Sequence, residues 1–224
     1  MTVAALDLEP NAVSLCDRYL QAQLSGNRRE ALRLVVEDGL SRGLSCFELH
    51  RLIQRAQVEI GRLWQEDRIT IAQEHMATAI SQVVLSHIYQ YAEVLPTNGK
   101  KVLVACVENE LHEFPARLVA DALDLSGFEV RYLGASVPTH HLLGMIDVES
   151  PDLLVLSATM AFHVPQLRDA VRRVREHRPG LLIAVGGSAC AWHPGLKEEL
   201  SAELSGSDAF ELVANAKRLL GVES

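Results

Sequence analysis

Lys101 to Val107 (KVLVACV) is a short and continuous apolar run. A run of this length without polar alternation is typical of a parallel strand that is buried on both faces. It follows a turn-rich stretch at residues 96–100 (PTNGK), and the sequence before that stretch contains almost no strand signal. We therefore expect the architecture to change here, with one domain at residues 1–95 and a second at residues 100–224.

Strands and helices alternate after this run. We expect further strands at residues 128–133, 153–157 and 181–185, with a weak fifth near 202–204, and helices at 114–126, 138–149, 164–177 and 207–220. This alternation predicts an α/β domain with a doubly wound parallel sheet, of the Rossmann or flavodoxin-like kind.

The first 95 residues have helical periodicity instead. Apolar positions predict helices at residues 11–24, 28–42, 45–64 and about 70–92. Ser45 is followed three residues later by Glu48, a capping-box pattern that marks the start of the third helix. Because the links between the helices are short, we expect an antiparallel helical bundle.

Composition excludes several classes of function. The chain has 224 residues, 48% of them hydrophobic, and a net charge of −8, which disfavours direct binding to nucleic acid. Its four cysteines form no C-x-x-C pair, so we expect neither a zinc site nor a disulfide framework. The first ten residues, with Asp7 and Glu9, lack the features of a secretory signal, and no stretch approaches a membrane span. These features predict a cytoplasmic protein.

Three polar or small-residue segments follow predicted strands. They are Glu108 to Pro115, Ser157-Ala158-Thr159, and Gly186-Gly187-Ser188. Ligands of doubly wound sheets bind at the carboxyl ends of the strands, so we expect the three segments to meet at one edge. In the first segment, Glu110 and His112 are two residues apart and point to the same side of an extended stretch. A carboxylate on one ring nitrogen suits a metal-binding histidine, although an ordinary polar loop is the alternative.

The whole pattern resembles a known family. Glu110-x-His112-x-x-Pro115, Ser157-x-Thr159 and Gly186-Gly187 resemble, over nearly all of residues 100–220, the signature of cobalamin-binding domains of the methionine synthase type. The resemblance implies that His112 is the lower cobalt ligand in place of the cofactor's dimethylbenzimidazole. It also implies a slot for the displaced nucleotide tail, lined by Ser157, Thr159, Gly186, Gly187 and Ser188; taken singly, these residues would indicate only tight packing.

The helical half carries a second resemblance. Trp64, Glu74 and His75 give W-x9-E-H, a spacing found in cobalamin-dependent photoreceptor regulators. The resemblance implies that these three residues cover the upper face of the cofactor, where a 5′-deoxyadenosyl group sits. It favours adenosylcobalamin, with methylcobalamin or hydroxocobalamin as alternatives. Without the resemblance, Trp64 would be read as bundle core, and Glu74 and His75 as surface residues.

Three residues depart from the family pattern. Glu110 stands in place of Asp and keeps the hydrogen-bond acceptor. Pro115 replaces a glycine, and its ring would crowd a macrocycle that approached this backbone. Gln65 occupies the position at which the tetrameric photoreceptors have a histidine, so a bis-histidine photoproduct through that position is excluded.

Three functions stay open on the sequence. We favour a cobalamin-binding sensor or regulatory protein that responds to light through cleavage of the Co–C bond. We expect no winged helix before residue 10, so that a partner protein would carry the output. The alternatives are a corrinoid carrier for a methyltransferase, and a degenerate module that binds another chromophore or acts as a scaffold. A homo-oligomer is compatible with each.

The chain shows no constellation for independent catalysis. We interpret Glu110, His112 and Ser157 as an orienting carboxylate, a ligand and a relay. We expect Cys106 to be a small buried residue and most other histidines to lie on the surface or in loops, with His163 near the exit of the third strand.

Overall fold

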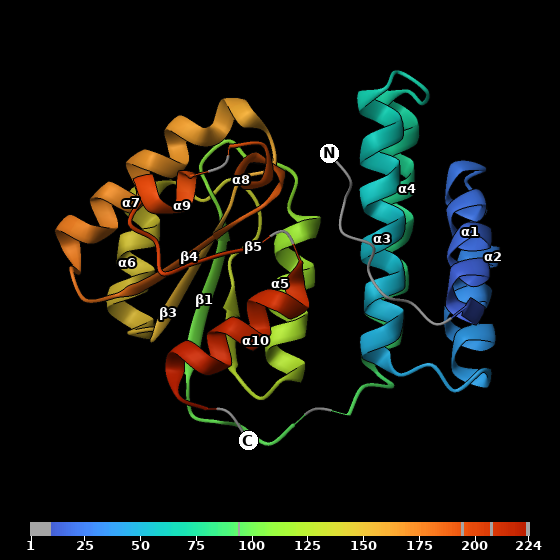
Figure 1. Ribbon diagram of the computed structural model, residues 1–224, viewed down its shortest axis with the longest axis horizontal. Coiled ribbons are helices and arrows are strands. Elements are labelled where there is room, and N and C mark those ends of the chain that lie inside the picture. The colour runs from blue at the N-terminus through green and yellow to red at the C-terminus, as the bar shows by residue number, and fades with distance from the viewer. Residues whose placement is uncertain (1–9, 94, 194, 207, 223–224) are drawn as a thin grey trace. The chain divides into compact units, whose positions relative to one another are not determined.

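The computed structural model describes residues 10–93, 95–193, 195–206 and 208–222 (Figure 1). The described residues up to Glu93 form one compact unit, and those from Leu95 onward form a second. The expectation about a secretory signal falls mainly on residues 1–9, which lie outside the described residues. None of the described helices combines the length and apolarity needed to cross a membrane.

The first unit is entirely helical. Its elements are α1 (Pro10–Leu24), α2 (Arg28–Leu32), the π-helix η1 (Arg33–Gly39), α3 (Cys46–Gln65) and α4 (Ile71–Tyr89). Ser45 and Glu48 form the predicted capping box, and Thr70 and Gln73 form a second one at the start of α4. The helix expected over residues 28–42 is present, but its middle part, Arg33–Gly39, is a π-helix.

The second unit is built on five parallel strands. These are β1 (Lys101–Cys106), β2 (Glu129–Tyr132), β3 (Leu153–Ser157), β4 (Leu182–Gly186) and β5 (Leu204–Gly206), in the order β2-β1-β3-β4-β5. The predicted α/β class with a doubly wound parallel sheet is therefore confirmed. The strand order reverses between β1 and β3, and this is the position at which such sheets bind ligands.

Helices cover both faces of the sheet (Figure 1). α5 (Phe114–Leu125) and α10 (Ala209–Leu220) pack on one face, and α6 (Thr139–Glu149) and α7 (Val164–His177) pack on the other. Along β1, Leu103 and Ala105 belong to one core cluster, while Val102, Val104 and Cys106 belong to the other. This two-sided burial explains why residues 102–107 are apolar without alternation. Short elements complete the unit: η2 (Ala161–His163), α8 (Ser188–Trp192) and α9 (Leu196–Glu199).

Candidate functional site

The segments after β1, β3 and β4 meet at the carboxyl edge of the sheet, as the topology predicts. Val107 N donates to Ser157 O, and Ala158 N donates to Gly186 O, so the three segments are joined directly by backbone hydrogen bonds. Asn109 adopts a positive φ of 69° and turns the chain immediately before Glu110. The candidate site therefore rests on the ends of the central strands.

Glu110 is the centre of this edge. Its side chain is 0% exposed, and each carboxylate oxygen has its own set of donors. Oε1 lies 2.9 Å from the backbone N of His112 and 2.6 Å from its Nδ1. Oε2 lies 2.7 Å from Thr159 N, 3.0 Å from Met160 N and 2.9 Å from His163 Nδ1. The predicted contact between Glu110 and His112 is therefore present.

The electrostatics favour an ionised Glu110. Burial opposes its charge, but hydrogen bonds from His112, His163 and backbone N–H groups outweigh burial and lower the pKa of Glu110 to about 2. An ionised carboxylate only accepts hydrogen bonds, so Nδ1 of His112 carries a proton. Nε2 is then the ring nitrogen that would bind a metal, and the His112 side chain is 35% exposed.

Two of the remaining histidines are buried, and His163 lies after β3 as expected. His163 is 6% exposed and donates to Glu110, and His50 is 1% exposed within α3, so neither is a surface residue. His163 lies 53 positions from Glu110 in the sequence, and a single histidine after a strand carries no local signal. The arrangement after β3, where Oε2 of Glu110 gathers three donors, is what gives His163 its role.

The hydroxyl groups of Ser157 and Thr159 also lie at this edge. Both hydroxyl oxygens are buried and have no hydrogen-bond partner among the described residues. A relay between Ser157 and Glu110 was therefore a wrong interpretation, since the carboxylate oxygens bond to other groups. Buried polar atoms without a protein partner are rare in folded proteins, and a ligand or an ordered water can supply the missing partner. They give this edge the polar, small-residue lining that a ligand with hydrogen-bonding groups needs.

The glycines after β4 allow close backbone packing. Gly187 has a φ of +92°, and a Cβ there would lie 2.2 Å from the backbone oxygen of Ala158. A Cβ on Gly186 would lie 3.2 Å from Gly206 O, and Ser188 begins α8. The structure thus accounts for both glycines by strand packing alone, and it brings them to the same edge as Ser157.

Three neighbouring residues complete this side of the sheet. Pro115 lies in the first turn of α5, as expected, and is partly buried. Cys106 is buried, as expected, and burial raises the pKa of its thiol to about 12. Trp192 is the last residue of α8 and is 47% exposed.

In the helical unit, Trp64, Glu74 and His75 lie near one end of the α3–α4 pair. Trp64 is in the last turn of α3 and is partly buried, while Gln65 is exposed. Glu74 is in the first turn of α4, and its Oε2 lies 2.5 Å from Nδ1 of His75. The Glu74 side chain is 15% exposed and the His75 side chain 66% exposed. The short link between the helices keeps the three residues at the same end.

A chain of hydrogen bonds connects Glu74 to the interior of the bundle. Thr78 Oγ1 lies 2.8 Å from Glu74 Oε1 and 3.1 Å from Gln57 Oε1, and its single proton is shared between these two acceptors. Gln57 Nε2 donates to Ser81 Oγ at 2.6 Å, and Ser81 Oγ lies 2.8 Å from Tyr19 Oη. The carboxylate of Glu74 is therefore oriented by its own helix and, through Thr78, linked to α3 and α1.

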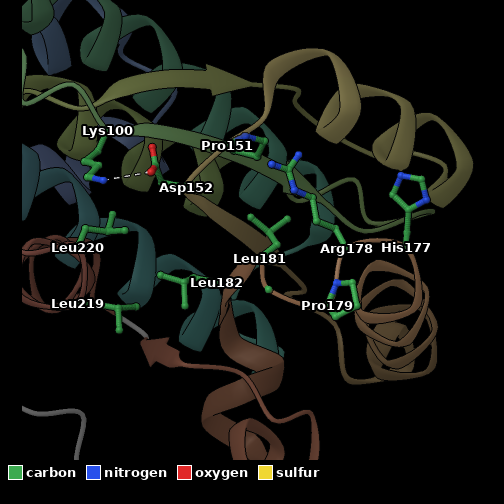
Figure 2. Close-up of a pocket in the computed structure, with 11 residues that line it drawn as sticks. Lys100, Pro151, Asp152, His177, Arg178, Pro179, Leu181, Leu182, Leu219 and Leu220 are labelled. Atoms are coloured by element: carbon green, nitrogen blue, oxygen red, sulfur yellow. Dashed lines mark hydrogen bonds and ion pairs between the residues drawn. The ribbon is translucent and has the colours of Figure 1, made fainter.

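A hollow of about 660 Å³ lies at the opposite edge of the sheet (Figure 2). Its lining includes Lys100 and Asp152, which precede β1 and β3 and form a 3.2 Å ion pair. His177 bonds to Asp147, and Arg178 bonds to Ile146 O. Because ligands of doubly wound sheets bind at the carboxyl edge, we do not assign the function to this hollow.

Comparison with known families decides the identity of the ligand. Residues 100–214 match the model of a B12 binding domain, and residues 15–89 match a second B12 binding domain model. The chain belongs to the B12-binding domain family. It is a cobalamin-binding protein with a helical B12-binding cap followed by a Rossmann-like B12-binding domain.

Two kinds of relative share these B12-binding domains. The HTH-type transcriptional repressor CarH of Myxococcus xanthus is 29% identical over 145 residues, which is 64% of this chain and 48% of the repressor. The match thus spans about half the length of the repressor. Dimethylamine corrinoid protein 2 of Methanosarcina acetivorans is 26% identical over 193 residues, covering 83% of this chain and 81% of that protein.

A solved structure agrees in fold. The monomethylamine corrinoid protein of Methanosarcina barkeri superposes with a TM-score of 0.81 at 19% identity, covering 92% of this chain and 99% of the other. At this identity the similarity shows the fold of the B12-binding protein and not its activity.

Proposed function

We propose that this cobalamin-binding protein is a sensor or regulatory protein that responds to light and signals through a partner protein. The observation that carries the proposal is the Glu74–His75 pair near Trp64, at one end of α3 and α4. A carboxylate held by Thr78 in a partly buried position is suited to accept hydrogen bonds from a ribose or an adenine. The W-x9-E-H spacing of photoreceptor regulators supports the same assignment.

His112 is the proposed lower cobalt ligand. A corrin supplies the equatorial ligands of its own cobalt, so a single imidazole with a fixed tautomer is the donor the protein must add. Glu110 fixes that tautomer by accepting from Nδ1. The donor set therefore fits the cofactor. The preferred form is adenosylcobalamin, which supplies a light-cleavable cobalt–carbon bond when bound; methylcobalamin and hydroxocobalamin are the alternatives.

Small and polar residues are the proposed tail slot. The hydroxyl groups of Ser157 and Thr159, which lack protein partners among the described residues, would bond to the nucleotide tail. The tail could pass close to the backbone at Gly186, Gly187 and Ser188, because these residues have small side chains or none. We propose domain boundaries at residues 1–95 and 100–224, so that the cap and the tail slot belong to separate domains.

Reconstitution in the dark tests the light response. The protein is loaded with adenosylcobalamin, and its absorption spectrum and elution volume are recorded before and after illumination. We expect the adenosyl spectrum to disappear and the assembly state to change. A sample loaded with hydroxocobalamin has no alkyl bond and serves as the control. An unchanged spectrum and an unchanged elution volume would refute the light-sensing proposal.

A corrinoid carrier for a methyltransferase is the second candidate. It is favoured by the match to the dimethylamine corrinoid protein, which covers most of both chains. In that case the partner is a methyltransferase, and the upper face must open to admit it. Methylation of the bound cobalt by a methylated donor and its methyltransferase would support the carrier. The variant Glu74→Gln separates the two functions. A sensor should bind adenosylcobalamin more weakly after this change, whereas a carrier should transfer methyl groups at an unchanged rate.

A further inference from the structure

One carboxylate is shared by two histidines from distant segments. Oε1 of Glu110 accepts from His112, in the loop after β1, and Oε2 accepts from His163, at the end of η2. Thr159 and Met160 add two backbone donors to Oε2. Glu110 thus ties the loop that carries the proposed cobalt ligand to the segment after β3.

His163 is held in a defined position. Its side chain is 8% exposed, and its ring lies 4.4 Å from the ring of Phe162 in an edge-on arrangement. His163 also serves as the residue from which α7 begins. Because the ring is packed and anchored to a helix, its Nδ1 is a fixed donor and not a mobile one.

A carboxylate needs such anchors to orient its other oxygen. The last torsion of a glutamate side chain has broad minima, so a carboxylate bonded at Oε1 alone would turn relative to the imidazole. Three donors on Oε2 prevent this rotation, and His163 supplies the one side-chain donor among them within the described part of the chain. The orientation of Oε1 toward Nδ1 of His112 therefore depends on the donors to both carboxylate oxygens.

We propose that His163 is a positioning residue that acts on His112 through Glu110. By donating to Oε2 it holds the carboxylate in the orientation that fixes the ring and the tautomer of His112. The inference rests on the proposed role of His112 as the lower cobalt ligand. It adds a second histidine to the support of the ligand, at a carboxylate with which the hydroxyl of Ser157 makes no hydrogen bond.

A matched pair of substitutions tests the proposal. His163→Asn keeps a donor close to the position of Nδ1, and His163→Leu has nearly the same shape as the Asn variant without a donor. His141→Leu is the control, because His141 is exposed on α6 and is not among the donors to Glu110. Each full-length variant is examined in two ways: by titration with hydroxocobalamin, and by nuclear magnetic resonance of ¹⁵N-labelled histidines without cofactor.

We expect His163→Leu to weaken cobalamin binding about tenfold, at the low end of the range for residues that support a metal ligand, and His163→Asn to restore it. The His112 resonances should move in the Leu variant and stay in place in the Asn and His141→Leu variants. Equal losses in Leu and Asn variants would reveal a merely structural role and overturn the proposal. Wild-type binding with unchanged His112 resonances in the Leu variant would overturn it as well.

The resonance measurement keeps the inference separate from the proposed function. If the wild-type protein fails to ligate cobalamin through His112, the proposed function falls, while the coupling of His163 to His112 is still read from the apoprotein. If the Leu variant fails to fold, the nuclear magnetic resonance spectrum of the wild-type protein still tests the proposal. A proton on Nδ1 of both His112 and His163 supports the proposal, and a proton on Nε2 alone of His163 overturns it.

Discussion

Replacing Glu110 by glutamine perturbs the centre of the site. Glutamine keeps one acceptor oxygen, but its NH₂ group accepts no hydrogen bond. Whichever way the amide turns, the NH₂ faces either the two donors of His112 or the three donors from Thr159, Met160 and His163. A histidine can change its tautomer, but a backbone N–H cannot. At least one backbone N–H therefore loses its acceptor.

The loss of unfolding free energy in Glu110→Gln can be worked out in two ways. A donor left without an acceptor in a buried site costs about 1–3 kcal/mol. The pKa of Glu110, lowered from 4.5 to about 2, gives about 3 kcal/mol when each unit of pKa counts as about 1.4 kcal/mol. Because the pKa is lower in the folded state, this stabilisation is present above about pH 4.5. It is lost as the pH falls from about 4.5 toward 2, and about 2 kcal/mol of it is gone at pH 3.

The assay is urea unfolding of the apoprotein at pH 7 and at pH 3. The chain has two tryptophans, Trp64 in the helical unit and Trp192 in the α/β unit, so a Trp64→Phe background lets fluorescence report on the α/β unit alone. We expect Glu110→Gln to lower the unfolding free energy by about 3 kcal/mol at pH 7 and by about 1 kcal/mol at pH 3. Glu108→Gln, an exposed residue in the same loop, is the control and should change it by less than about 0.5 kcal/mol. A difference below about 1 kcal/mol at pH 7, or one that does not change with pH, would refute the reasoning.

Three further substitutions test other parts of the site. Gly187→Ala places a Cβ 2.2 Å from a backbone oxygen and should lower the unfolding free energy by about 3 kcal/mol or more. The control Gly144→Ala has open space around the new Cβ and should not destabilise α6. Equal effects of the two variants in thermal unfolding would contradict this reasoning. Thr78→Val removes a donor to Glu74 and should weaken binding of adenosylcobalamin about fivefold, equivalent to about 1 kcal/mol. Hydroxocobalamin should bind with unchanged affinity. Equal affinity losses for both cofactors would argue against a role at the upper ligand. His112→Ala should weaken cobalamin binding at least about tenfold without altering the circular dichroism spectrum, and a wild-type affinity would exclude ligation by this residue.

Much of the fold could be predicted because its signals are local. The continuous apolar run at residues 102–107 predicts burial on two faces, and the structure assigns its alternating side chains to two core clusters. Ser45 and Glu48 are close in sequence, so their capping box could be read directly. The π-helix at Arg33–Gly39 could not, because its apolar positions also fit an α-helix.

The same distinction holds at the site. Glu110 and His112 are two residues apart, and their contact follows from the geometry of an extended stretch. The contact between Glu110 and His163 depends on how the chain after β3 turns back toward the loop after β1, and no spacing rule encodes that turn. Ser157 shows the converse, since its place at the edge was predictable while its lack of a protein partner was not.

Electron paramagnetic resonance of the Co(II) form tests the central claim most directly. The protein is prepared with ¹⁵N-labelled histidine and loaded with unlabelled cobalamin, whose cobalt is then reduced by one electron. If His112 is the lower ligand, each axial cobalt line splits into a doublet from one ¹⁵N nucleus, and His112→Ala abolishes that doublet. A triplet in the labelled protein would come from a ¹⁴N ligand of the cofactor itself and would contradict ligation by His112.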